Sequence, residues 1–139
     1  MLRPLSKLLA GALILGLAFL HPGSASAGPT LAAQSSDDAG VLVVVTPAAL
    51  GPGETVWEFE IAMDTHSQAL DADISQAAVL VDEAGRRYAP LAWEGDPPCG
   101  HHRSGILRFA APADMPGAVE LQIEGVGGAG TRTFRWELK

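Results

Sequence analysis

The sequence predicts an all-β fold built as a sandwich of two sheets with about seven strands. In segments 57–63, 119–124 and 134–138 apolar residues alternate with polar ones, which is the pattern of a strand with one buried and one solvent-facing side. Turns rich in glycine, proline or aspartate separate the strand segments at spacings typical of small sandwiches, and no segment has the period of a long helix. An immunoglobulin-like sandwich fits this pattern best, and a Greek-key barrel of the cupredoxin type is the alternative.

The first 27 residues contain the three parts of a secretory signal peptide. Arg3 and Lys7 form a short basic region, an apolar stretch covers residues 8–20, and the small residues 25–27 (ASA) form a cleavage pattern. The apolar stretch has 13 residues, too few for a membrane-spanning helix, which needs about 20. We therefore expect residues 1–27 to be removed on export, which leaves a periplasmic or secreted protein without membrane contact.

The first half of the remaining chain is expected to contain a leader, two strands and a short helix. Residues 28–40 are small and polar, and we expect them to form a flexible leader before a β-sandwich domain at 41–139. The first strand is expected at 41–46, a run rich in valine, and the second at 57–63. A helix of one or two turns fits residues 69–77.

The second half of the chain is expected to continue as strands joined by hairpins. Residues 78–82 and 86–93 flank Gly85, whose backbone freedom suits a tight turn. Pro90 is expected to place part of the second arm at a sheet edge or a bulge. The remaining predicted strands are 105–109, 119–123 and 134–138, and the glycine-rich segment 125–130 is predicted to be a hairpin loop.

The charge balance and the cysteine content exclude several classes of protein. The chain has 9 basic and 16 acidic residues, a net charge of −7, which argues against nucleic acid or anionic membranes as partners. Its single cysteine, Cys99, cannot form an internal disulfide, so a disulfide-stabilised scaffold is excluded. We expect an exposed Cys99 to link two copies of the protein through a disulfide on oxidation.

The histidines outside the signal segment fall in two predicted loops. His66 follows the strand at 57–63, and His101 and His102 lie in a loop that also contains Cys99. Neutral imidazole and thiolate are ligands for copper and zinc. We therefore predict a copper or zinc site in a protein that acts as a carrier or sensor, provided that the two loops meet at the same end of the sandwich.

The spacing of these residues matches no established metal motif. The chain lacks the Cys, His and Met arrangement of a blue-copper loop and the paired cysteines of a zinc site. The alternative is that the histidines only stabilise the loops, in a module that binds a protein partner through its acidic surface. Asp64, Asp71 and Asp73 offer oxygen ligands, but they lack the spacing of a calcium-binding loop with its closing glutamate.

Catalysis has little support in the sequence. Cys99 has histidines nearby, but no acidic partner is indicated and no nucleophile-elbow motif occurs. The glycine-rich segment 125–130 joins two strands instead of opening a helix, so it does not match a phosphate-binding loop. We therefore do not expect an enzyme.

Residues 57–109 also carry a resemblance to a group of proteins. The THS turn at 65–67 and the GHHR segment at 100–103 resemble motifs of small secreted bacterial immunoglobulin-like proteins, most of which have no known activity. The resemblance implies an immunoglobulin-like domain and places His66 and the histidine pair at 101–102 in matching motifs. It also implies that glycine is usual at the position of Cys99, so that Cys99 would be an optional ligand.

Overall fold

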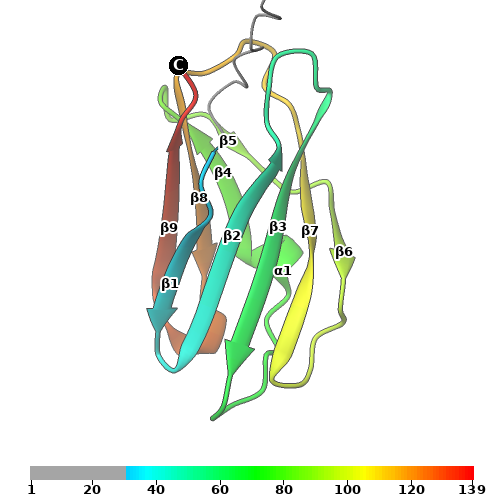
Figure 1. The fold of residues 1–139 in the computed structure, drawn as a ribbon, viewed down its shortest axis with the longest axis vertical. Coiled ribbons are helices and arrows are strands. Elements are labelled where there is room, and N and C mark those ends of the chain that lie inside the picture. Colours follow the sequence, from blue (N-terminus) through cyan, green and yellow to red (C-terminus); the bar gives the residue numbers. More distant parts are fainter. Residues whose placement is uncertain (1–30) are drawn as a thin grey trace, which may run out of the picture.

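The computed structural model describes residues 31–139, which form two antiparallel β-sheets packed face to face (Figure 1). The five-stranded sheet has the order β1-β2-β3-β7-β6, and the four-stranded sheet has the order β5-β4-β8-β9. The prediction of an all-β, two-sheet sandwich is confirmed, and the sheets share no strand, so they do not form one closed barrel. The strands are β1 (Gln34–Asp38), β2 (Val41–Ala49), β3 (Val56–Thr65), β4 (Ala78–Asp82), β5 (Arg87–Tyr88), β6 (Ala92–Gly95), β7 (His102–Ala110), β8 (Ala118–Glu124) and β9 (Thr131–Glu137).

The helical content is small. α1 (Ile74–Ala77) is shorter than the helix predicted at 69–77, because Asp73 caps its start by accepting a hydrogen bond from the backbone N–H of Ser75 at 3.0 Å. A 3₁₀ turn, η1 (Val126–Gly128), lies within the predicted hairpin between β8 and β9. In the part of the chain that the structure describes, no helix is long and apolar enough to cross a bilayer.

The hydrophobic core lies between the two sheets and is formed by alternate residues of their strands. Phe59 of β3 lies in contact with both layers, because its ring centroid is 5.8 Å from that of Phe109 and 5.5 Å from that of Trp136 on the opposite sheet. The predicted alternation is therefore correct in phase as well as in period. The largest fully buried apolar side chains are Trp57, Phe59, Phe109, Phe134, Ile61, Met63, Ile74, Leu80, Leu107, Leu121 and Ile123.

The predicted leader at 28–40 contains a strand, so this prediction is wrong for Gln34–Asp38. β1 pairs with β2 along its whole length, and its polar side chains contact the edge of the other sheet. The backbone N–H of Arg135 donates to Gln34 Oε1 at 3.1 Å. A strand held by polar contacts shows no apolar alternation, which is why the sequence pattern does not reveal it. The predicted signal segment, residues 1–27, lies outside the described residues.

The strand predicted at 86–93 is in fact two short strands that belong to different sheets. β5 pairs with β4, with Tyr88 opposite Leu80, whereas β6 pairs with β7, with Trp93 opposite Leu107. Pro90, which has no N–H to donate to a strand ladder, lies where the chain crosses between the sheets. Together with β1, this division gives nine strands within residues 31–139 instead of about seven.

Candidate functional site

The register between β3 and β7 brings the two histidine-bearing segments together. Asp64 near the end of β3 lies opposite His102 at the start of β7. Beyond this pair, the backbone N–H of Thr65 donates to the carbonyl of His101 at 2.9 Å. Because consecutive Cα atoms are about 3.8 Å apart, His66 lies immediately beside this crossing point. The two segments therefore meet at one end of the sandwich, here named the histidine end.

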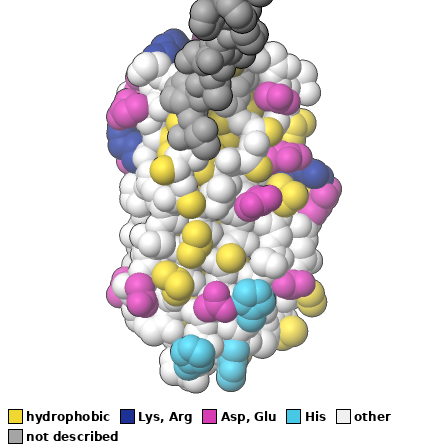
Figure 2. Space-filling view, viewed as in Figure 1, with side chains coloured by type: hydrophobic (Ala, Val, Ile, Leu, Met, Phe, Trp, Pro, Cys, Tyr) yellow, Lys and Arg dark blue, Asp and Glu magenta, His cyan; other side chains and the backbone are white. Residues whose placement is uncertain are grey.

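His102 belongs to β7, so the prediction that all three histidines lie in loops is wrong for this residue. The strand begins there because its pairing with β3 extends as far as Asp64. His66 and His101 lie outside the strands, and all three rings are exposed. Figure 2 shows the histidine side chains gathered at the lower end of the five-stranded sheet, with acidic side chains beside them.

Asp64 and His102 form a specific contact at this end. His102 Nδ1 lies 2.5 Å from Asp64 Oδ1, and the two side chains remain 63% and 51% exposed. The hydrogen bond and the negative charge of Asp64 raise the pKa of His102 above its ordinary 6.5, with a smaller contribution from Asp96. In the neutral ring, a proton on Nδ1 that is donated to Asp64 leaves Nε2 unprotonated, on a side chain that is largely exposed.

Arg103 connects the two histidine-bearing segments through hydrogen bonds on the core side of the sheet. Its side chain is 1% exposed, because the alternation of β7 turns it toward the core while His102 faces outward. Its Nη1 donates to the carbonyls of Leu70 at 3.0 Å and Ala72 at 2.7 Å, and its Nη2 donates to the carbonyl of Asp96 at 3.3 Å. One buried guanidinium thus holds both the segment after His66 and the segment before the histidine pair.

A shallow groove lies beside the Asp64 and His102 pair. It has a volume of about 420 Å³ and is formed by residues from the ends of β1, β2 and β3. Its polar lining includes Asp37, Asp64, His66 and Ser67. Side-chain oxygen and nitrogen atoms that could act as ligands therefore line an open groove at the histidine end.

The predicted metal ligands are neighbours but do not form a preassembled site. Within residues 31–139, no three side chains of histidine, cysteine, aspartate or glutamate lie together in an arrangement that could hold a metal ion. Cys99 is an exposed free cysteine in the loop between β6 and β7, as expected for a thiol open to oxidation. Of the predicted residues, only His102 makes a side-chain contact with another potential ligand, Asp64.

Two residues of this end were not recognised from the sequence as parts of the site. The sequence indicates Asp64 only as an oxygen ligand for calcium or as a residue that stabilises the turn, because the predicted strand ends at residue 63, whereas β3 continues to Thr65. Arg103 appears in the sequence only as the last residue of the GHHR segment, and nothing there indicates that it is buried. Neither role is visible in a local pattern, because each depends on at least one contact with a residue 31 or more positions away along the chain.

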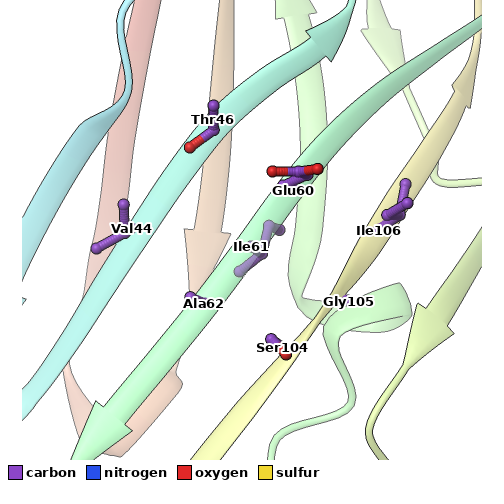
Figure 3. A pocket seen from close by; sticks show the side chains of 8 residues that line it. All are labelled: Val44, Thr46, Glu60, Ile61, Ala62, Ser104, Gly105 and Ile106. Carbon is purple, nitrogen blue, oxygen red and sulfur yellow. The ribbon is translucent and has the colours of Figure 1, made fainter.

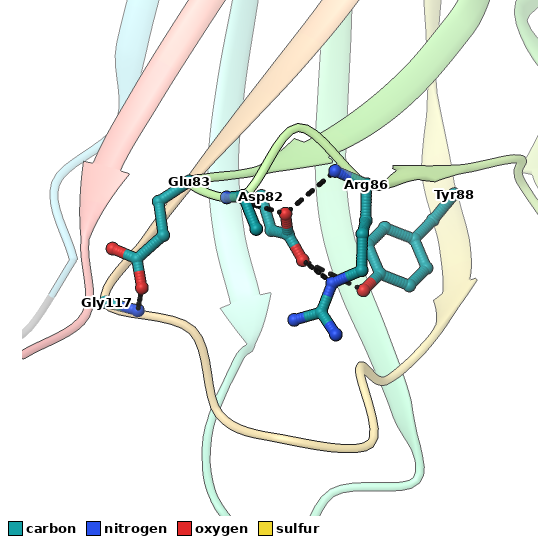
Figure 4. Close-up of polar contacts among 6 residues, drawn as sticks. Asp82, Glu83, Arg86, Tyr88 and Gly117 are labelled. Carbon is teal, nitrogen blue, oxygen red and sulfur yellow. Dashed lines mark hydrogen bonds and ion pairs between the residues drawn. The ribbon is translucent and has the colours of Figure 1, made fainter.

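A different aspartate organises the opposite end of the sandwich. Asp82 is buried in the β4–β5 turn, and its oxygens accept hydrogen bonds from the backbone N–H groups of Ala84 and Arg86, from Arg86 Nε at 2.7 Å and from the hydroxyl of Tyr88 at 3.0 Å (Figure 4). Burial acts to raise the pKa of Asp82, but the hydrogen bonds from Arg86 and Tyr88 outweigh it, so this pKa lies below the ordinary 3.8. The adjacent Glu83 accepts a hydrogen bond from the backbone N–H of Gly117 at 2.9 Å.

No family model, no curated protein sequence and no solved structure matches this chain.

Proposed function

We propose that this protein is an exported carrier or sensor that binds a copper or zinc ion at the histidine end. The ligands in this proposal are His66, His101 and His102, with Cys99 as an optional fourth. The observation that carries the proposal is the contact between His102 Nδ1 and Asp64 Oδ1. A histidine that binds a metal through one ring nitrogen almost always donates its other ring N–H to a carboxylate, a carbonyl or water.

The exposure of the three rings supports an adaptable site. Exposed side chains change rotamer within picoseconds to nanoseconds, and the backbone hydrogen bond between Thr65 and His101 keeps the two segments close together. The ion would be bound when the rings of His66 and His101 turn toward Nε2 of His102. An open site of this kind also suits a carrier or sensor, because the ion can be exchanged with solvent or with a partner.

Isothermal titration calorimetry of the purified protein with Zn²⁺ and with Cu²⁺ near pH 7.5 tests the proposal. We expect a saturable heat for at least one of the two ions, with one ion bound per chain. His102→Ala should weaken the affinity by at least about tenfold, as the loss of a ligand or of its supporting contact does in metal sites. Removing all three histidines should abolish the heat.

Matched substitutions separate a specific site from weak binding to a negatively charged surface. Glu124→Gln removes an exposed carboxylate at the β8–β9 hairpin, and it should leave the affinity unchanged. Cys99→Ser should have little effect if the thiol is optional. No saturable heat with either ion, or full affinity in the triple histidine variant, would refute the proposal.

A further inference from the structure

The outer face of the five-stranded sheet has an unusual composition. By the register of the strands, the residues that point away from the core include Val44 of β2, Ala62 of β3 and Ile106 of β7. These side chains are only partly exposed, and they form an interrupted apolar strip across the middle of the sheet: Ala62 lies opposite Val44, but its partner on β7 is Ser104, and Ile106 lies opposite Glu60. Figure 2 shows hydrophobic surface as separate patches in the middle of the face, above the histidines.

The centre of this strip is hollowed. The hollow has a volume of about 320 Å³, and small side chains form its floor while longer ones form its walls. In Figure 3 the short side chains of Ala62 and Ser104 lie in the lower half of the view, and the longer ones of Thr46, Glu60 and Ile106 lie above them. The hollow is open and its lining comes from three neighbouring strands, β2, β3 and β7, an arrangement that can accept part of an extended polypeptide.

The charges on this face are strongly unequal. Its outward carboxylates outnumber its cations, because Arg108 is the single outward-facing lysine or arginine on the described strands of this sheet, and it is already paired with Glu58 at 2.8 Å and with Glu94. Glu60, in the wall of the hollow, makes no ion pair within the described residues. The outward-facing carboxylates are Asp37, Glu58, Glu60, Asp64 and Glu94.

We propose that this face is a docking surface for an extended segment of a partner protein that presents aliphatic and basic side chains alternately. The aliphatic side chains would pack on Val44, Ala62 and Ile106, and a lysine or arginine would pair with Glu60. Burial of partly exposed apolar side chains supplies affinity, and the carboxylates supply selectivity and a fast encounter with a basic partner. This proposal is independent of metal binding, because it uses residues in the middle of the sheet.

The same charges disfavour two other occupants. An anionic membrane surface would be repelled by the carboxylates of this face. A second copy of the chain would place two acidic faces against each other, and like charges brought together in an interface are costly. A basic segment, by contrast, would neutralise the unpaired charge of Glu60 when it binds.

A peptide titration followed by ¹H–¹⁵N NMR tests the proposal. The probe is the acetylated and amidated octapeptide KTVTKTVT, which in an extended conformation presents lysine and valine on one side and threonine on the other. Two matched peptides replace either the lysines by glutamate or the valines by serine. We expect shift changes at Val44, Ala62 and Ile106, and at least tenfold weaker binding of both matched peptides.

Charge reversal at one residue provides the control on the protein. Glu60→Lys should weaken the binding of the basic peptide at least tenfold, while Glu120→Lys, on the outer face of the other sheet, should not. Unchanged backbone spectra away from the substitution establish that each variant is folded. Because the titration contains no metal, its result is independent of the proposed metal site.

Several results would overturn the proposal. These are the absence of shift changes at millimolar concentrations of the basic peptide, equal binding of the acidic peptide, and shift changes centred on β4, β8 and β9. Shift changes on this face that depend on protein concentration without any peptide would instead show that the occupant is a second copy of the chain.

Discussion

Asp64 and Asp82 lie at opposite ends of the sandwich, and each accepts a hydrogen bond from a basic side chain. Asp82 is buried and its oxygens accept four hydrogen bonds from its own turn and from Tyr88. Asp64 is half exposed and contacts only His102 among the described side chains. The comparison shows that an aspartate beside a cation can complete a structural turn or leave capacity for a ligand, depending on how many of its acceptor sites are already used.

The largest expected difference between the two aspartates is in thermal stability. Asp82→Ala leaves several donors of the β4–β5 turn without a partner, and the loss of a partner from buried polar groups is costly. We expect the melting temperature to fall by about 10 °C or more. Asp64→Ala should change it by no more than about 2 °C, because exposed charge pairs contribute little. Circular dichroism melts of both variants at pH 7 measure this, and equal losses would show that the two ends have the same role.

The second difference concerns metal affinity. Asp64→Asn removes the carboxylate that orients His102 and increases its basicity, and the loss of such a supporting contact typically costs ten- to a hundredfold in affinity. We expect a loss of this size in calorimetric titrations with the ion that the wild-type protein binds. Asp82→Asn serves as the control, measured at a temperature at which it is folded, and should retain the wild-type affinity. A wild-type affinity in Asp64→Asn would remove Asp64 from the site.

A smaller effect is expected from the hydroxyl of Tyr88. Tyr88→Phe keeps the ring and removes one of the hydrogen bonds to Asp82. We expect a decrease in melting temperature of about 4–8 °C, which corresponds to the loss of one ordinary hydrogen bond in a domain of this size. Burial and the hydrogen bond to Asp82 raise the pKa of Tyr88 above its ordinary 10. A spectrophotometric titration should therefore show its ionisation above pH 10, and a lower pKa in Asp82→Ala, because the contribution of Asp82 is lost while that of burial remains.

The smallest effect is the pH dependence of stability, and it has opposite signs at the two ends. The pKa of His102 is raised in the folded protein, so its contact with Asp64 stabilises the fold fully below about pH 6.5, and this contribution disappears as the pH rises through the raised pKa. The pKa of Asp82 is lowered, so its contribution is present above about pH 3.8 and is lost as the pH falls through the lowered value.

Melting curves across this range distinguish the two contributions. Asp64→Ala should be less stable than the wild-type protein by a degree or two near pH 5.5 and nearly equally stable near pH 9, because the charge attraction requires a protonated His102 and the hydrogen bond of the neutral ring joins two exposed groups. A difference between the two proteins that is constant from about pH 5 to pH 9 would show that the charge of His102 does not contribute to stability.

The fold class and most of the strands follow from local patterns. The alternation in β3, β8 and β9 predicts these strands and the face that each buries, because a side-chain period of two and the exclusion of apolar groups from water are properties of the segment itself. The hairpin at Gly85 is confirmed with a positive φ of 80°, a conformation that glycine adopts easily. The pairing of β1 and the crossing between sheets at Pro90 were not predicted, because they depend on partners elsewhere in the chain.

The candidate site divides in the same way. The sequence by itself determined that histidines occur in two segments, one of which follows the strand predicted at 57–63. Only the tertiary structure decided that Asp64 meets His102, 38 positions later, and that Arg103 is buried while its neighbour is exposed. The physical reason is that alternation sets the direction of each side chain within its own strand, whereas the register between strands, fixed by the packing of both sheets, decides which side chains meet.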